Sequence, residues 1–287
     1  MNTERDSAAF EAYKAKADNG DAQAQNDLGV CYRIGRGVAK DDDLAAHWFR
    51  KAASQGCADG QNNLGTCYFY GWGPAKDEEL ATYWYRKAAE QWRVMAEQGD
   101  AKAQYKLGDC YAYGDGLVQD DGLAAYWFRK AAEQGHTQAQ VSLGRCYREG
   151  EGVTKNLMQG VWWYRQAAEQ GDTLAQVNLG YCYEEGEGVS KSLVQAISWY
   201  RKAADQGVNY ALHTLGNCYA EGKGVAKDEI EAHAYYNLAG ATYERSREKL
   251  AVLEKQMTPD RIAAGKNRAK ELQKEIDAKI AAKAAGK

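Results

Sequence analysis

The sequence predicts an all-α solenoid of six two-helix repeats with capping helices at both ends. The motif CYxxGxG recurs six times, at Cys31, Cys67, Cys110, Cys146, Cys182 and Cys218. The Leu-Gly pair just before each motif recurs at spacings of 36, 43, 36, 36 and 36 residues. Such a period is typical of stacked helical hairpins, each burying its apolar face against its neighbours. Because six copies of one catalytic loop would be improbable, we interpret these glycines and thiols as repeat structure.

Residues 1–20 are predicted to form an N-terminal cap, and residues 21–240 to hold the six repeats. The stretch 7–19 resembles an unpaired second helix of the repeat, and Gly20 follows it. The end units of a solenoid depart from the repeat because one of their faces has no neighbour.

The first helix of each repeat is predicted from its apolar spacing. Four residues of the first repeat fall on one helical face: Ala24, Leu28, Cys31 and Tyr32. Gly29 lets the partner helix approach closely. Gly35 is expected to end the helix, because glycine accepts the left-handed conformation that a helix terminus often needs.

The second helix begins at a residue able to cap its free N–H groups. The six capping residues are Asp41, Asp77, Asp120, Asn156, Ser192 and Asp228. An aromatic residue recurs further along: Trp48, Trp84, Trp127, Trp163, Trp199 and Tyr235. We expect these aromatic side chains to be core anchors that meet small residues.

The 43-residue spacing reveals an insertion near residues 92–98. Seven extra residues are close to two helical turns, which keeps the facing of the helix and lengthens it by about 10 Å. We expect a protruding helix around Trp92, Val94 and Met95. This segment is interpreted either as a tolerated duplication or as a contact or dimerisation element.

Residues 241–287 are predicted to form C-terminal capping helices and a frayed tail. One helix is expected from about residue 243 to 256. Thr258 then reads as an N-cap and Pro259 as the first residue of a last helix. The final segment AKIAAKAAGK is expected to fray.

Charge and hydropathy exclude several classes of partner. The net charge is −3 and the isoelectric point is near 5.9, without the clustered Lys and Arg of a nucleic-acid-binding surface. The N-terminus lacks the apolar core of a signal peptide, and no run of about 18 apolar residues exists. We therefore expect a cytoplasmic protein with no nucleic-acid binding and no membrane insertion.

The seven cysteines are expected to be reduced. Stacked helices lie about 8–10 Å apart, beyond the roughly 7 Å between Cα atoms that a disulfide tolerates. The six repeat cysteines are therefore predicted to be buried thiols that act as small apolar side chains. Cys57 lies just after a helix end and is expected to be the one reactive thiol.

The repeated pattern LGxCYxxGxGVxKDxxxAxxWYRKAAEQG resembles the Sel1-like repeat, a relative of the tetratricopeptide repeat. The resemblance covers residues 8–275, with a tail similar to that of bacterial members. It implies a right-handed superhelix of antiparallel helix pairs, no active site, and an adaptor for peptides or protein surfaces. A cysteine-rich branch of the family pairs two cysteines per repeat and is associated with beta-lactam binding. This chain has one cysteine per repeat, so those disulfides are not expected.

The geometry implied by the resemblance places the first helices on a concave groove. Variable residues of these helices are therefore the predicted peptide- or protein-binding residues, because exposed apolar groups in a concavity usually mark a binding site. They are Val30, Arg33, Asn62, Phe69, Tyr70, Tyr105, Tyr113, Val141, Arg145, Tyr181, Glu184, Glu185, Tyr210, His213 and Asn217.

Side-chain charge along this groove indicates the kind of partner. The repeats run from a short basic end through an aromatic middle to an acidic end, the latter formed by Glu149, Glu151, Glu184, Glu185, Glu187 and Glu221. We expect a protein or peptide partner with an apolar anchor and basic residues. A solvated charged edge without a partner is the other interpretation.

We therefore expect a non-catalytic scaffold or adaptor, monomeric, with no catalytic residue, cofactor or metal. His213 and His233 could approach each other, but no third ligand recurs near them. One alternative is a binder of small molecules or cell-wall fragments, such as muropeptides or beta-lactams, or a weak hydrolase. Another is a structural homo-oligomer that assembles through the long helix at 78–98.

Overall fold

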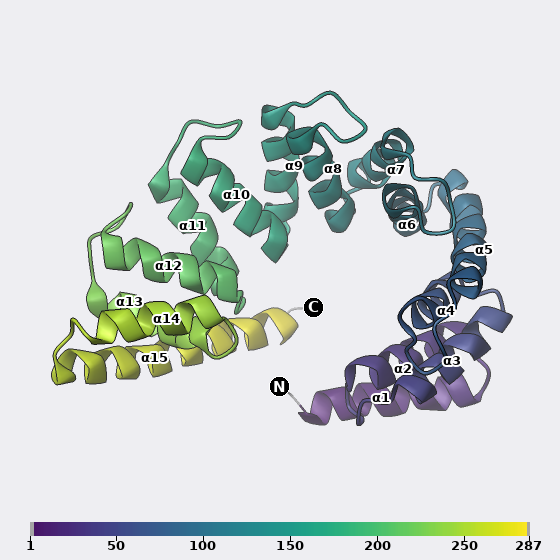
Figure 1. Cartoon of the computed structure of the whole chain (residues 1–287), viewed down its shortest axis with the longest axis horizontal. Coiled ribbons are helices and arrows are strands. Elements are labelled where there is room, and N and C mark those ends of the chain that lie inside the picture. The colour runs from purple at the N-terminus through teal and green to yellow at the C-terminus, as the bar shows by residue number, and fades with distance from the viewer. Residues whose placement is uncertain (1–2, 286–287) are drawn as a thin grey trace. The chain divides into compact units, whose positions relative to one another are not determined.

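The computed structural model describes residues 3–285, and all regular structure in that range is α-helical. The helices are α1 (Thr3–Asp18), α2 (Ala22–Ile34), α3 (Asp42–Ser54), α4 (Ala58–Tyr70), α5 (Glu78–Glu97), α6 (Ala101–Tyr113), α7 (Asp121–Glu133), α8 (Thr137–Glu149), α9 (Leu157–Glu169), α10 (Thr173–Glu185), α11 (Leu193–Ala204), α12 (Asn209–Glu221), α13 (Glu229–Gly240), α14 (Glu244–Glu254) and α15 (Pro259–Ala285). The all-α solenoid predicted from the repeats is confirmed (Figure 1).

The array divides into two compact units. Unit 1 is Met1–His136 and contains α1 to α7, and unit 2 is Thr137–Lys287 and contains α8 to α15. Within each unit the first helix of a repeat packs against its own second helix, and that second helix packs against the next first helix. The boundary falls between the third and fourth repeats.

A glycine of the first helix lies directly under an aromatic ring of the second helix in every repeat. A Cβ atom placed on Gly29 would lie 2.6 Å from the Phe49 ring, and one on Gly144 would lie 2.7 Å from the Tyr164 ring. The equivalent pairs are Gly65 with Tyr85, Gly108 with Phe128, Gly180 with Tyr200, and Gly216 with Tyr236. Any side chain at these glycines would push the two helices apart.

This contact corrects the predicted role of the tryptophans. The fully buried ring is the residue after each tryptophan, as Phe128 and Tyr164 are each 1% exposed. Trp127 is only half-buried and packs against the edge of a cluster formed by α5 and α6. Trp199 is the exception, because it is 8% exposed within the α9–α10 cluster. The tryptophans therefore cover the edges of the core instead of forming its centre.

The predicted N-caps of the second helices are confirmed. The Asp41 side chain accepts a hydrogen bond of 2.8 Å from the backbone N–H of Leu44. The same bond is made by Asp77, Asp120, Asn156, Ser192 and Asp228. Each carboxylate, amide or hydroxyl satisfies an N–H group that has no partner within its helix.

Glutamine side chains join the ends of neighbouring helices. Gln25 donates to the Ala17 carbonyl at 3.1 Å, and Gln55 donates to the Gln25 side-chain oxygen at 2.8 Å. The second bond recurs between Gln134 and Gln104, Gln170 and Gln140, and Gln206 and Gln176. Burying an amide is costly unless it is hydrogen-bonded, so these pairs fix how the first, third, fourth and fifth hairpins close.

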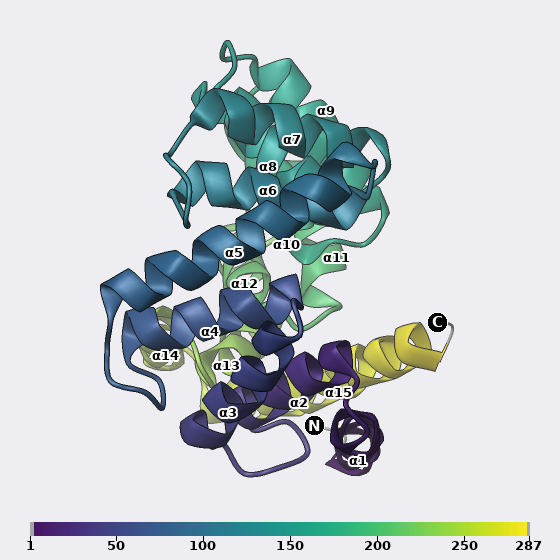
Figure 2. The same cartoon turned by 90° about the vertical axis from the view of Figure 1, so that its right-hand side faces the viewer.

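The insertion breaks this pairing in the second repeat. Helix α5 has 20 residues, whereas the other second helices have 12 or 13 (Figure 2). Gln91 occupies the position of Gln55, but the helix continues through it, and the buried Oε1 atom of Gln61 has no hydrogen-bond partner. The extra turns therefore cost one buried hydrogen bond.

The inserted turns pack against the repeat instead of protruding. Trp92 is 4% exposed and lies in a cluster with Ala58 and Leu107. Val94 and Met95 remain exposed on the other side of the helix. The prediction of a protruding element is therefore wrong for Trp92, because the two added turns keep its face directed toward the core.

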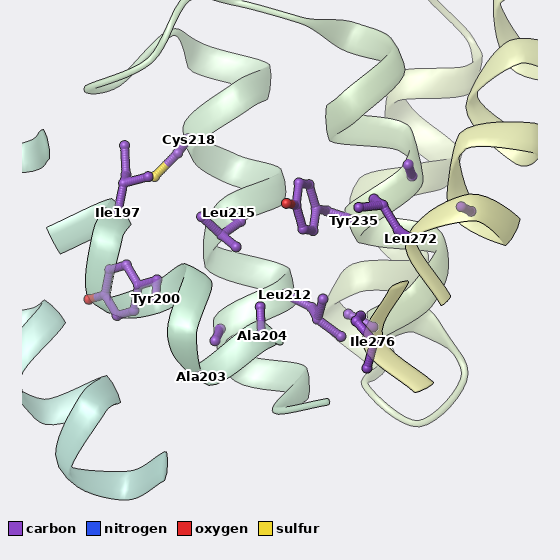
Figure 3. Close-up of a cluster of buried hydrophobic side chains, with 14 of the residues drawn as sticks. Ile197, Tyr200, Ala203, Ala204, Leu212, Leu215, Cys218, Tyr235, Leu272 and Ile276 are labelled. Atoms are coloured by element: carbon purple, nitrogen blue, oxygen red, sulfur yellow. The ribbon is translucent and has the colours of Figure 1, made fainter. Parts of the chain in front are cut away.

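The C-terminal helices cover the last repeat. Leu272 and Ile276 of α15 share a buried cluster with Leu212 of α12 (Figure 3). Lys279 forms an ion pair of 2.8 Å with Asp205, and Lys283 donates to the Gly171 carbonyl at 3.3 Å. Helix α15 continues to Ala285 through the segment expected to fray, while residues 286 and 287 of that segment lie outside the described residues.

The glycine–aromatic contact predicts which ring carries stability. Phe128→Ala should lower the free energy of unfolding by about 3–5 kcal/mol, because it leaves a cavity over Gly108. Tyr126→Ala, on the exposed side of the same helix, should change it by less than about 1 kcal/mol. Urea denaturation followed by circular dichroism measures both, and equal losses would contradict the assignment.

Candidate binding surfaces

In each unit, residues of three successive first helices line a hollow. In unit 1 a hollow of about 240 Å³ lies among α2, α4 and α6. Its lining residues are Asn26, Asp59, Asn62, Asn63, Lys102 and Lys106. In unit 2 a hollow of about 370 Å³ lies among α8, α10 and α12, lined by Arg148, Val177, Asn178, Tyr181 and Tyr210. Variable positions of the repeat thus gather at concave surfaces.

The aromatic surface of unit 1, formed by Phe69, Tyr70 and Trp72, is held by stacking. The Tyr70 and Trp72 rings stack with centroids 4.6 Å apart, and Phe69 meets Tyr70 edge-on at 4.9 Å. Arg33 belongs to α2, and its guanidinium lies 3.5 Å from the centroid of the Trp72 ring. The same guanidinium forms an ion pair of 3.4 Å with Asp42. Such cation–π and ring contacts fix the side chains before any partner binds.

The Phe69 and Tyr70 side chains of this aromatic surface are exposed to solvent. Tyr70 is 59% exposed and Phe69 is 42% exposed. Tyr113 and Ile34 occupy the repeat position of Tyr70 in the neighbouring first helices and are also exposed. Large apolar groups gathered on one exposed face are typical of an interaction site.

The structure divides the remaining predicted residues of unit 1. Asn62 lines the unit 1 hollow. Val30 is partly buried and packs against the α3–α4 cluster, so it serves the core. Tyr105 is half-buried, with its ring stacked on His136 at 4.9 Å between centroids.

The predicted residues of unit 2 also separate into surface and core. Tyr181 and Tyr210 line the unit 2 hollow, where the Arg148 guanidinium lies 4.9 Å from the Tyr181 ring. Val141 is 9% exposed within the α9–α10 cluster and is not accessible. Asn217 accepts a hydrogen bond of 2.8 Å from the Tyr236 hydroxyl, which makes it a packing residue.

Most carboxylates predicted to form an acidic end are paired. Glu184 accepts a hydrogen bond of 2.7 Å from the Tyr200 hydroxyl. The ion pairs are Arg145 with Glu151, Arg148 with Glu149 and Glu187, and Lys223 with Glu221. Glu185 is exposed and forms no ion pair or hydrogen bond within residues 3–285. The negative potential of this edge is therefore weaker than the sequence suggests.

The inserted turns line another hollow in unit 1, of about 310 Å³. It lies where α5 ends beside the first turns of α4 and α6, and its lining includes Cys57, Gln91, Trp92, Met95 and Lys102. Cys57 is half-buried and its Sγ lies 3.8 Å from Gln23 Oε1. Burial raises the pKa of the Cys57 thiol, so accessibility is not accompanied by thiolate character.

The histidines are used for packing. His213 Nδ1 lies 2.8 Å from the Ser246 hydroxyl, and His233 Nε2 lies 2.9 Å from Glu254. The two rings therefore have different partners. Over residues 3–285, no group of three or more His, Cys, Asp or Glu side chains is placed to hold a metal ion. No helix in that range is long and apolar enough to cross a membrane.

Comparison with known families identifies the repeat. Six Sel1 repeats match residues 22–57, 58–91, 101–136, 137–172, 173–208 and 209–241. The chain belongs to the Sel1 repeat family. Residues 92–100 fall between the second and third Sel1 repeats, where α5 is extended. No curated protein sequence matches the chain.

Solved structures of similar proteins are bacterial. A Sel1 repeat protein from Oxalobacter formigenes is 34% identical, covers 82% of this chain and 96% of its own, and has a TM-score of 0.62. A protective antigen of uropathogenic Escherichia coli is 29% identical, with coverages of 98% and 82% and a TM-score of 0.37. An immunity protein from Pseudomonas aeruginosa is 22% identical, with coverages of 77% and 83% and a TM-score of 0.50.

The sequence interpretation missed several residues that take part in the packing or line the hollows. The buried glutamines recur at Gln25, Gln61, Gln104, Gln140 and Gln176, a regularity that could have revealed them. Arg245 and Lys249 of α14 lie beyond the last repeat, so comparing the repeats with one another could not single them out. They line a further hollow in unit 2.

Thiol reactivity tests the placement of the cysteines. An aromatic disulfide reagent should modify about one thiol in the folded protein, because six cysteines are buried and Cys57 is half-buried. The reaction should be slower than that of free cysteine at pH 7.5 and should accelerate as pH rises, because its pKa is raised. Cys57→Ser should abolish the signal. Three or more fast thiols would contradict the structure.

Proposed function

We propose that this Sel1 repeat protein is a non-catalytic scaffold that binds a protein or peptide through its first-helix surfaces. The observation that carries the proposal is the aromatic surface of unit 1, which is large, exposed and already ordered. Family membership supports the same function, because Sel1 repeat proteins generally bind proteins.

Pre-ordering is what makes this surface suitable. A flexible apolar side chain loses rotamer freedom when a partner immobilises it, which subtracts from the binding free energy. Tyr70 and Trp72 are already stacked, and the Arg33 guanidinium lies over the Trp72 ring. Tyrosine, tryptophan and arginine are the residues that most often dominate binding energy at protein interfaces.

The partner we propose carries an apolar or aromatic anchor for unit 1 and basic residues for unit 2. In unit 2 the support is narrower than the sequence suggests, because it rests on Glu185 and on the tyrosines that line the hollow. We further propose that the protein works as a monomer in a reducing, cytoplasmic compartment. The seven free cysteines are compatible with that compartment.

Removing an aromatic anchor should shorten the lifetime of the complex. A partner retained from lysate by the immobilised chain would be identified and its kinetics measured by biolayer interferometry. Tyr70→Ala should raise the dissociation rate about tenfold, with little effect on association. Tyr126→Ala, an equally drastic change on an exposed second helix, should leave both rates unchanged. Equal effects would place the interface elsewhere.

Reversing the charge of Glu185, an exposed carboxylate of unit 2, should alter the salt dependence of binding. Glu185→Lys should slow association with the same partner and flatten its dependence on salt between about 50 and 300 mM. Glu184 is unsuitable for this test because it binds the Tyr200 hydroxyl. Glu169→Lys makes the same charge change on a second helix and serves as the control. Identical rates for both variants would argue against basic residues in the partner.

A further inference from the structure

A hollow of about 400 Å³ lies between α12 and α14 in unit 2. It is lined by His213 of α12 and by Arg245, Glu248, Lys249 and Val252 of α14. The α14 residues follow the spacing of a single helical face, so all four point to the same side. Helix α14 stands where a seventh first helix would follow the sixth repeat, which makes this hollow a continuation of the first-helix surface.

Two cations that line this hollow have no ion-pair partner among residues 3–285. Arg245 and Lys249 are exposed, lie one turn apart, and form no ion pair or hydrogen bond within the described chain. Glu248 lines the same hollow but is not within ion-pair distance of either. Elsewhere in unit 2, Arg148 and Arg268 each pair with carboxylates. The positive charge at α14 is thus left for another molecule.

The floor of the hollow is a buried, fixed imidazole. His213 is 9% exposed, and its Nδ1 atom is held by the fully buried Ser246 hydroxyl at 2.8 Å. Tyr236 of α13 and Tyr243 contact the ring at centroid distances of 5.9 and 5.1 Å. With Nδ1 engaged and the ring held on two sides, Nε2 is the remaining polar atom of the side chain.

The charges of α14 act on this imidazole. Burial lowers the pKa of His213, and the positive charges of Lys249 and Arg245 lower it further. Burial raises the pKa of Tyr236, which also contacts the ring, to about 12, so this tyrosine adds no charge near pH 7. The hollow therefore concentrates positive potential around a group that would gain a proton if an anion arrived.

Helix α14 begins after Tyr243, whose side chain makes no capping hydrogen bond, and Glu244 places a carboxylate in the first turn. That carboxylate offsets the positive end of the helix dipole, so the positive charge of the hollow comes from Arg245 and Lys249. Val252 supplies an apolar wall beside the cations.

We propose that the α12–α14 hollow binds a carboxylate side chain from an acidic segment of a protein partner. Arg245 and Lys249 donate charge-assisted hydrogen bonds to the carboxylate, and Val252 contacts its methylene groups. His213 donates from Nε2 when protonated. This assignment rests on the proposed scaffold function and adds an acidic element to the partner chemistry.

The probe is a fluorescent tetraglutamate peptide, with tetraglutamine as its neutral control, titrated into the full chain. Fluorescence anisotropy at low salt should show saturable binding of tetraglutamate and none of tetraglutamine. Arg245→Gln with Lys249→Gln should weaken binding at least tenfold. Arg247→Gln removes one positive charge from α14 outside the hollow and should leave the affinity unchanged, whereas Arg245→Gln alone, which also removes one charge, should weaken it. Circular dichroism establishes that each variant is folded.

Three results would overturn the proposal. The first is equal affinity for both peptides. The second is an equal loss of tetraglutamate affinity in the Arg247 variant and the double variant. The third is competition by citrate so strong that binding of a free carboxylate explains the site. Tyr70→Ala should not affect tetraglutamate binding. If that variant loses its protein partner while the peptide still binds, the scaffold function and this hollow are supported independently. If only the peptide fails to bind, the hollow assignment alone is wrong.

The pH dependence gives a second readout. A bound carboxylate stabilises the charged imidazole and raises the pKa of His213, so the affinity for tetraglutamate should rise as pH falls from about 7.5 to 6. Glutamate side chains remain ionised over this range because their pKa is about 4.3. His213→Gln should remove this dependence while retaining the contribution of the two cations. A pH dependence unchanged in that variant would exclude His213 from the site.

Discussion

The close contact between a first-helix glycine and a second-helix ring is the constraint on which the repeat depends. With no Cβ at Gly108, the Phe128 ring lies directly on the α6 backbone, and the hairpin closes at a distance that a larger residue would prevent. The same closure brings the ends of the helices together, which allows Gln134 to reach Gln104. It also leaves Trp127 at the edge of the core, where it seals the boundary with the preceding cluster.

The insertion shows how far this frame can be changed. After two additional turns, the same face of α5 is still directed toward the core, so Trp92 joins the buried cluster that includes residues of α6. The following repeats retain their own glycine–ring contacts. The cost is local, because only the hydrogen bond to Gln61 Oε1 is lost among the five buried glutamines. The gain is a hollow beside Cys57, lined in part by Gln91, Trp92 and Met95 of the extended helix.

Function follows from the positions that the frame leaves free. The stacked rings beside Arg33 in unit 1 provide a rigid apolar surface, whereas unit 2 presents tyrosines and charges in separate hollows. Pairing of carboxylates with Arg145, Arg148 and Lys223 limits the acidic potential of unit 2, while Arg245 and Lys249 form no ion pair within the described part of the chain. A partner that uses both units would therefore combine apolar contacts with charge contacts of both signs.

The sequence alone determined the repeat, its helices and their caps, because these depend on local signals that recur six times. Asp41 and its equivalents cap as expected, and Gly35 adopts the left-handed conformation. Which variable residues face solvent was decided only by tertiary packing. Val30 and Val141 enter core clusters, and Glu184 is bound by Tyr200 from the adjacent helix. The sequence could not reveal these outcomes, because burial and pairing depend on contacts between helices, which the local spacing of residues within one helix does not report.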